Sequence, residues 1–250
     1  MSDEQPVRLH CFAHSAGGVS VFDGWAESTG PGVEVRAVSL PGEQRRRSEP
    51  RVTTHEALLA DLLPPFTGPR CGPYVLYGHG LGALVALTVT RALHEAGVPG
   101  PALLAVSACP PPHTPSALPD VRGATDADVL HLLGGQGAVP PGSDEGIVLR
   151  AMLPVLRADL ELAKALEEAA RTPSSTGPLT TPVLVVSSQA NPLAPPTITD
   201  GWWQWTQGPV RSRTVPGRHF FVRGGRELPR LLGRACRVAG RLARQRVPVG

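Results

Sequence analysis

The segment from Gly78 to Gly82 has the spacing in this chain that is most informative about chemistry. It reads Gly-His-Gly-Leu-Gly and follows the frame G-x-S-x-G, in which a sharp turn between a strand and a helix presents a nucleophilic serine. We call this segment the elbow. Its serine position is Gly80, which has no side chain. Backbone N–H groups after such a turn, beginning with that of Leu81, can still stabilise an oxyanion, so the elbow predicts an oxyanion site without its nucleophile.

A histidine and a glycine-rich loop are the other candidates for chemistry. His219 could take or give a proton near neutral pH; packing between Phe220 and Phe221 is the alternative. The segment from Ala13 to Gly18 reads Ala-His-Ser-Ala-Gly-Gly, and its glycines let the backbone approach a ligand closely. We call it the oxyanion loop, because its N–H groups could supply a second oxyanion donor. A tight turn that needs positive φ explains the same glycines.

Strands and helices alternate along the chain around these segments. Short apolar runs ended by Gly or Pro are typical of buried strands, and segments with helical spacing lie between them. The alternation predicts an α/β fold, with a mostly parallel sheet covered by helices on both faces. The expected strands span residues 7–12, 33–40, 74–77, 102–107, 182–188 and 210–215, and the expected helices span 54–63, 81–96 and 228–243.

The segment from about residue 121 to 171 breaks this alternation. It has helical spacing around a Gly/Pro-rich stretch and contains no strand pattern. A helical insertion of this kind on an α/β body is a candidate lid. We therefore expect a single domain over residues 1–250, with a helical lid insertion at about 121–171.

Composition argues against several classes of function. The 24 basic and 21 acidic residues give a net charge of +3, too small to indicate a nucleic-acid partner. No run of about 18 apolar residues is present, so no membrane span is expected. The N-terminus is acidic and polar, unlike a signal peptide, which predicts a cytoplasmic protein. The four cysteines lack CxxC spacing, which predicts buried thiols, no metal site and no cofactor.

Five segments in order carry a resemblance to a known family. They are Phe12-Ala-His-Ser-Ala-Gly-Gly18, Leu40-Pro-Gly-Glu43, Gly78-His-Gly-Leu-Gly82, Leu153-Pro-Val-Leu-Arg-Ala-Asp159 and Pro216-Gly-Arg-His-Phe-Phe221. They resemble the type II thioesterases of polyketide and nonribosomal peptide synthases, although Ala13 and Glu43 replace a usual proline and arginine. The resemblance covers about residues 7–237 and implies an α/β-hydrolase fold with a lid. It also implies an acyl or polyketide intermediate on an acyl carrier protein as substrate, and oxyanion or substrate-binding roles for Ala13, His14, Ser15, His79 and Leu81, with packing as the alternative for His79.

The chain departs from that family at two of three catalytic positions. In the family a serine attacks the thioester, a histidine takes its proton and a carboxylate stabilises the imidazolium. The serine maps onto Gly80 and the carboxylate onto Asn191. An alternative position for the acid, after the strand that ends near Ser107, also lacks a carboxylate. His219 alone is kept.

Three explanations of Gly80 are open. Natural loss of acyl-enzyme chemistry explains both substitutions, and we favour it. An engineered Ser-to-Gly change would make the chain an inactivated type II thioesterase, but leaves Asn191 unexplained. A relocated nucleophile would have to lie within about 3 Å of His219. The candidates for that nucleophile are Ser15, Ser107 and Cys109.

Natural loss of the serine predicts a non-hydrolytic step on a polyketide or related acyl intermediate. His219 would be the general base, and the elbow amides would be the oxyanion donors. Cyclisation, elimination and epimerisation all suit this arrangement, and slow hydrolysis by activated water is a further possibility. From a different class, the chain could be a non-catalytic protein that binds a carrier protein or its intermediate.

Overall fold

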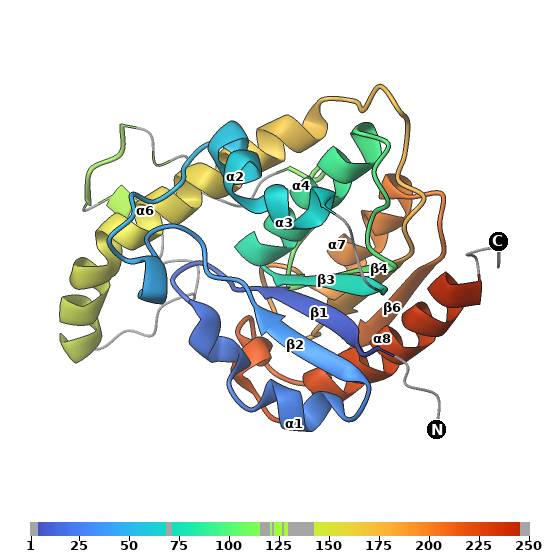
Figure 1. Ribbon diagram of the computed structural model, residues 1–250. Helices are drawn as coiled ribbons and strands as arrows, with labels where there is room; N and C mark the ends of the chain where they lie inside the picture. The colour runs from blue at the N-terminus through green and yellow to red at the C-terminus, as the bar shows by residue number, and fades with distance from the viewer. Residues whose placement is uncertain are drawn as a thin grey trace.

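The computed structural model describes residues 5–68, 72–115, 121, 123–126, 128–129 and 143–245, with side chains in the last range described from residue 151 onward. The described residues contain one parallel sheet with the strand order β2-β1-β3-β4-β5-β6. Figure 1 shows the sheet across the middle of the molecule, with helices above and below it. The strands are β1 Val7–Phe12, β2 Val33–Ala37, β3 Tyr74–His79, β4 Leu103–Ser107, β5 Val183–Ser187 and β6 Val210–Thr214.

Continuous apolar runs form the centre of the sheet. The strands β3, β4 and β5 are buried along their whole length, as expected for parallel strands covered on both faces. The strands β2 and β6 lie at the two edges and are more exposed. The predicted parallel sheet is therefore confirmed. The largest difference in strand length is at β2, which was expected over 33–40 and spans 33–37.

Helices cover both faces of the sheet. They are α1 Trp25–Thr29, α2 His55–Leu62, α3 Pro64–Thr67, α4 Leu81–Glu95, α6 Ser143–Arg171, α7 Pro196–Thr199 and α8 Glu227–Gln245, with short 3₁₀ helices η1 Val19–Phe22, η2 Gln44–Arg46, η3 Asp200–Trp205 and η4 Phe221–Arg223. On one face α2, α3, α4 and α6 enclose a core that includes Phe66 and Leu166. On the other face α1 and α8 enclose a core that includes Trp25 and Leu232. The three predicted helices correspond to α2, α4 and α8.

Local signals set the ends of two of these helices. The Thr54 side-chain oxygen accepts a hydrogen bond from the Ala57 N–H at 3.2 Å and so caps α2. At the C-terminal end of α4, Gly97 has a φ of +63°, and the Val98 N–H donates to the Leu93 carbonyl at 2.9 Å. A glycine in this conformation is a common helix stop.

The long helix α6 belongs to the predicted insertion. Its Leu162 and Leu166 pack in the core that contains α4, whereas Leu160 packs with Val121 and Val129 in a separate small cluster. The Gly/Pro-rich stretch predicted within the insertion, residues 134–142, lies outside the described residues. The predicted helical character is confirmed over α6, and the function of the insertion as a lid stays a prediction.

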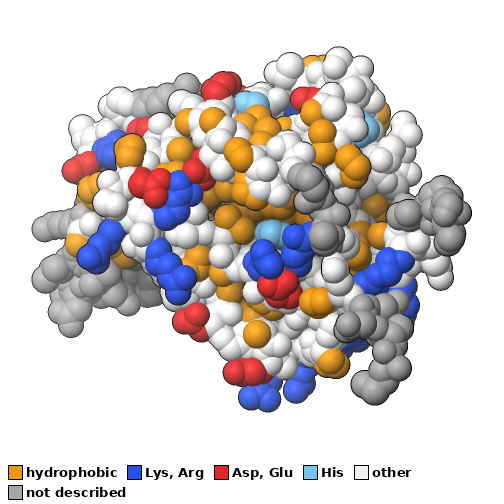
Figure 2. All heavy atoms as spheres, in the orientation of Figure 1, with side chains coloured by type: hydrophobic (Ala, Val, Ile, Leu, Met, Phe, Trp, Pro, Cys, Tyr) orange, Lys and Arg blue, Asp and Glu red, His pale blue; other side chains and the backbone are white. Residues whose placement is uncertain are grey.

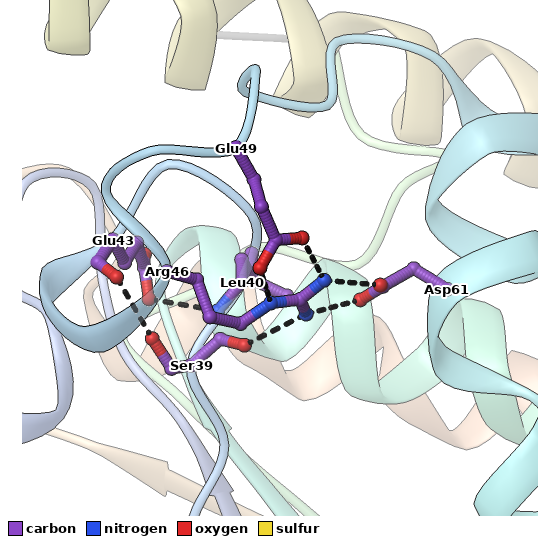
Figure 3. A network of polar contacts seen from close by, with 6 residues as sticks. All are labelled: Ser39, Leu40, Glu43, Arg46, Glu49 and Asp61. Carbon is purple, nitrogen blue, oxygen red and sulfur yellow. Dashed lines mark hydrogen bonds and ion pairs between the residues drawn. The ribbon is translucent and has the colours of Figure 1, made fainter.

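Polar contacts fix the turn after β2 (Figure 3). The Leu40 N–H donates to the Glu43 carboxylate at 3.0 Å, so the Glu43 side chain closes its own turn. Arg46 makes a bidentate pair with Asp61 of α2, at 2.8 and 2.6 Å, and also pairs with Glu49. Bidentate pairs of this kind restrict geometry, so the turn is tied to α2.

Charged side chains of both signs are interspersed over the face shown in Figure 2. A band of hydrophobic side chains crosses the middle of that face, and no large area of a single charge is seen there. Within the described ranges, no helix is long and apolar enough to cross a membrane.

Three cysteines are buried as free thiols: Cys11, Cys109 and Cys236. Burial raises the pKa of each thiol. Because the thiolate is the reactive form, none of these three is activated as a nucleophile. The predicted buried thiols are confirmed at these positions, and Cys71 lies outside the described residues.

Candidate active site

The elbow is built by close backbone approach. A Cβ at Gly78 would lie 1.9 Å from the Gly82 carbonyl oxygen, and a Cβ at Gly82 would lie 2.1 Å from the Phe12 carbonyl oxygen. Atoms cannot approach so closely, so both positions require glycine. Their packing fixes the start of α4 against the ends of β1 and β3.

Gly80 is the turn residue between β3 and α4. Its φ of +56° and ψ of −117° are a backbone conformation that other residues rarely adopt. The Gly80 N–H donates to the Ser107 carbonyl at 2.9 Å, which holds the turn in place. A Cβ at Gly80 would have the His14 Cβ, at 3.6 Å, as its nearest neighbour. The elbow therefore has the shape and the room for a nucleophile that the residue does not provide.

The N-terminus of α4 lies directly after Gly80 in the chain. The helix begins at Leu81, and the first N–H groups of a helix have no acceptor within it. The helix dipole adds partial positive charge at the same end. Because the Gly80 N–H is used by Ser107, the Leu81 N–H is the first amide of the elbow that could serve an oxyanion.

The structure brings His219 and Asn191 together from the segments that follow β6 and β5. Their Nδ1 and Oδ1 atoms lie 3.2 Å apart. Asn191 is fully buried, and His219 is half-buried. Burial lowers the pKa of His219, so its ring is mainly neutral at pH 7, the form that a general base needs.

A second contact fixes the orientation of the Asn191 amide. Its Oδ1 accepts a hydrogen bond from the Leu193 N–H at 3.1 Å. The oxygen therefore also faces His219, so Nδ1 of the imidazole carries the proton and Nε2 keeps a lone pair. The Asn191 Nδ2 is buried without a partner among the described residues. Asn191 thus selects the tautomer of a base, as a carboxylate would, but contributes no charge.

His79 is held by a chain of hydrogen bonds next to the elbow. Its Nε2 lies 2.8 Å from the His219 carbonyl oxygen, and its Nδ1 lies 2.8 Å from the Ser107 hydroxyl. Because a carbonyl can only accept, Nε2 carries the proton and Nδ1 accepts from Ser107. The Tyr77 hydroxyl lies 2.8 Å from the same Ser107 oxygen. These contacts favour the packing alternative for His79, in which its ring supports the segment that carries His219.

No described contact places one of the candidate replacement nucleophiles on the ring of His219. The Ser107 hydroxyl is buried against His79. The Cys109 thiol donates to the Pro110 carbonyl at 3.3 Å. Ser15 accepts a hydrogen bond from the His14 ring through its carbonyl. The relocated-nucleophile explanation therefore gains no support from these contacts.

The oxyanion loop wraps around the His14 ring. The ring Nδ1 donates to the Ser15 carbonyl at 2.8 Å, and a Cβ at Gly17 would lie 2.9 Å from the same ring. The ring of Phe220 lies 4.8 Å away between centroids, and that of His79 lies 5.9 Å away. Burial lowers the pKa of His14 to about 4, so this ring is neutral near pH 7.

We expect the free energy of unfolding to fall as the pH drops from 6.5 towards 4. Burial lowers the His14 pKa from 6.5 to about 4, so in this window the unfolded chain binds a proton that the folded chain does not. The contribution is complete above pH 6.5 and amounts to about 3 kcal/mol. Urea unfolding at several pH values measures it. Burial also lowers the pKa values of His79 and His219, so His14→Gln should reduce the steepness without abolishing it, and an equally steep dependence in that variant would contradict the assignment to His14.

One residue outside the predicted site, Asp159, also contacts the oxyanion loop. The Asp159 carboxylate of α6 accepts a hydrogen bond from the Ala16 N–H at 2.7 Å and pairs with Arg51 at 2.8 Å. Asp159 ends one of the five resembling segments, but no role was predicted for it. The contact joins residues 143 positions apart, which no local pattern reveals.

The groups gathered at the elbow are a neutral base, an amide that orients it and a helix N-terminus. Together they can bind a carbonyl oxygen and move a proton beside it, whereas position 80 cannot form an acyl-enzyme. No group of three or more His, Cys, Asp or Glu side chains within the described segments is arranged to hold a metal ion.

Comparisons with known proteins cover nearly the whole chain. The sequence model of the family described as "Thioesterase domain" matches residues 7–236. Thioesterase PikA5 of Streptomyces venezuelae is 33% identical over 228 residues, which are 86% of this chain and 75% of that protein. A probable cadicidin biosynthesis thioesterase of Streptomyces griseus is 31% identical over 227 residues, 88% of this chain and 60% of that protein.

Solved structures show the same likeness. The RedJ thioesterase of the prodiginine biosynthetic pathway in Streptomyces coelicolor superposes with a TM-score of 0.76 at 33% identity, covering 93% of this chain and 86% of that one. YbtT, a type II thioesterase of the yersiniabactin pathway, superposes with a TM-score of 0.76 at 26% identity, covering 95% and 96%.

Proposed function

The chain belongs to the thioesterase domain family and has the α/β-hydrolase fold, and from that premise we propose that it acts on an acyl or polyketide intermediate bound to a carrier protein. The similarity to thioesterases named for biosynthetic pathways supports this substrate class. We propose further that the reaction is a non-hydrolytic acid–base step, with His219 as the general base.

One observation carries this proposal. The elbow keeps the backbone conformation of a nucleophile turn, with room for a side chain, around a residue that has none. Beside it, the His219–Asn191 contact keeps a lone pair on Nε2. A base and an oxyanion donor at a position where the covalent step is impossible would support acid–base chemistry without an acyl-enzyme.

The shared first step is removal of a proton from the carbon next to the thioester carbonyl. His219 Nε2 takes the proton, the C–H electron pair forms a C=C bond, and the carbonyl electrons move to the oxygen beside the Leu81 N–H. Return of the proton to the opposite face gives epimerisation. Loss of a β-hydroxyl, protonated by the imidazolium, gives an alkene and water. Attack on a second carbonyl, whose oxygen takes the proton, gives cyclisation.

A second candidate is a protein that binds the carrier-bound intermediate without converting it. The uncharged Asn191 favours this candidate, because the imidazolium formed during catalysis receives no stabilisation from a carboxylate. The two candidates share the substrate and differ in whether a proton moves.

Hydrogen–deuterium exchange at the substrate separates them. An acyl-N-acetylcysteamine thioester is incubated in D₂O with the protein, and label at the α-carbon is followed by mass spectrometry. The wild type is expected to accelerate labelling, and His219→Ala to slow it by about 10²- to 10⁴-fold, the range for loss of a general base.

The matched control is His55→Ala, because His55 begins the surface helix α2 and pairs with the exposed Glu56. This variant should label the substrate at the wild-type rate. Equal rates for the wild type and His219→Ala would rule out His219 as the base. Binding of the thioester by a wild type that labels nothing would leave the binding candidate in its place.

A further inference from the structure

The Asp159 carboxylate of α6 forms a hydrogen bond with the oxyanion loop. Oδ2 of Asp159 accepts the Ala16 N–H at 2.7 Å, and Oδ1 accepts the Arg51 guanidinium at 2.8 Å. Asp159 is 5% exposed, so both contacts are shielded from water. Charge-assisted hydrogen bonds of this length are among the stronger polar contacts in proteins.

The residue that receives this contact has an unfavourable backbone conformation. Ala16 has a φ of +55°, in the left-handed region that residues with a Cβ rarely occupy. Such a conformation persists where surrounding contacts impose it. Next to it, the Gly17 N–H donates to the His14 carbonyl at 2.8 Å. The turn and the Asp159 carboxylate together hold the loop in a shape that Ala16 would not adopt alone.

The contact between Asp159 and Arg51 depends on the glycine at position 42. A Cβ at Gly42 would lie 2.3 Å from the Arg51 Cγ, so the missing side chain makes room for Arg51 to reach Asp159. Burial raises the pKa of Asp159, and the Ala16 N–H and the Arg51 charge oppose this rise. The oxyanion loop, the segment that carries Arg51 and α6 thus meet at the Asp159 carboxylate.

We infer that Asp159 is the positioning residue of the oxyanion loop, through which α6 sets the geometry of the oxyanion site. The Ala16 N–H donates to the carboxylate and the Gly17 N–H donates to the His14 carbonyl, so any donor that the loop gives to substrate comes from the amides of Ala13, His14, Ser15 or Gly18. Their directions follow from the turn that Asp159 holds. The helix α6 is packed on α4 through Leu162 and Leu166. The oxyanion loop, held by α6, and the elbow amides, at the start of α4, are therefore positioned by two helices that pack on each other.

This role rests on the proposed function for its kinetic consequence, but not for its structural one. Ala16 and Arg51 donate to different oxygens of Asp159, and Asp159→Asn replaces one of these oxygens by an NH₂ group, so one of the two donors then faces a donor. The matched control is Asp126→Asn, which removes an exposed carboxylate that also pairs with α6, through Arg157 at 2.8 Å. The conservative variant Arg51→Lys keeps the charge beside Asp159, whereas Arg51→Gln removes it.

Amide hydrogen exchange of the peptide over residues 12–22 gives the structural readout. We expect this peptide to exchange at least tenfold faster in Asp159→Asn, less so in Arg51→Lys than in Arg51→Gln, and unchanged in Asp126→Asn. The kinetic readout is α-proton exchange of the thioester. We expect kcat to fall by about 10- to 100-fold in Asp159→Asn, as for small misplacements of catalytic groups, with KM nearly unchanged.

The outcomes separate the two proposals. Wild-type exchange of the 12–22 peptide in Asp159→Asn overturns the positioning role, whatever the activity. Faster exchange in all peptides to the same degree also overturns it, because Asp159 is then a general stabiliser. Faster exchange confined to the loop supports the positioning role, even if the wild type catalyses no reaction and the proposed function fails.

Discussion

Gly80→Ser combined with Asn191→Asp is expected to give a chain that hydrolyses acyl thioesters through an acyl-enzyme. The elbow already has the turn that presents a serine, and the nearest atom to a new Cβ is 3.6 Å away. The carboxylate introduced by Asn191→Asp would accept a hydrogen bond from the His219 Nδ1–H through a negatively charged oxygen. Loss of a triad nucleophile costs about 10⁶-fold in kcat in a serine protease, so we expect a gain of at least 10³-fold over the unchanged chain.

The single variants show whether the missing serine at position 80 or the missing carboxylate at position 191 limits hydrolysis more. Gly80→Ser alone retains the correct His219 tautomer, because the Leu193 N–H fixes the Asn191 amide. It lacks only the charge, so adding Asn191→Asp should raise kcat by less than the roughly 10⁴-fold that a triad Asp-to-Asn change costs when it also gives the wrong tautomer. The same change should raise the His219 pKa, since a nearby negative charge favours the imidazolium. Hydrolysis of a butyryl-N-acetylcysteamine thioester and NMR titration of His219 measure the two effects.

Asn191→Asp alone should remain unable to form an acyl-enzyme, and mass spectrometry of the protein checks this. A double variant that folds but neither hydrolyses the thioester nor becomes acylated would contradict the placement of the nucleophile at position 80. Brisk hydrolysis by Gly80→Ser alone would instead favour the interpretation of Gly80 as an engineered change in a thioesterase.

Gly82→Ala is expected to destabilise the fold more than any surface substitution. The new Cβ would lie 2.1 Å from the Phe12 carbonyl oxygen and 2.6 Å from that of Ala13. Both are backbone atoms, so the start of α4 or the end of β1 must move. We expect a loss of about 3 kcal/mol or more, which lowers Tm by about 6–12 °C for a chain of this size.

Gly68→Ala is the matched control, because a Cβ at Gly68 meets nothing within 4 Å and its φ is not positive. Thermal unfolding followed by circular dichroism compares the two variants with the wild type. A Tm of Gly82→Ala within about 2 °C of the control would show that the approach of α4 to β1 is looser than the structure has it.

The apolar pattern was sufficient to predict the fold. Parallel strands buried on both faces must be apolar at nearly every position, and β4 and β5 are such runs. The edge strand β2 was predicted too long, because Val38 continues the apolar pattern beyond Ala37, the last residue paired with β1. Pairing with β1 decides where β2 ends, and pairing partners are not visible in a single segment.

The site was predicted in part, from resemblance more than from pattern. The pairing of His219 with Asn191 followed from their motif positions, and in the structure the two side chains are in hydrogen-bond contact. The Tyr77–Ser107–His79 chain was not predicted, because it needs the register between β3 and β4, which sets His79 beside Ser107. The Asp159 contact was missed because it depends on how α6 packs, and helix packing is a property of the whole core.

The left-handed conformation of Gly80 also places the chain in a trade-off between stability and activity. A residue with a Cβ held at a φ of +56° costs the fold about 1–3 kcal/mol, whereas glycine adopts this conformation freely. An enzyme that uses a serine here must bear that strain for its acyl-enzyme. A natural loss of the serine would therefore gain this stability, and a return to covalent catalysis would have to give it up again.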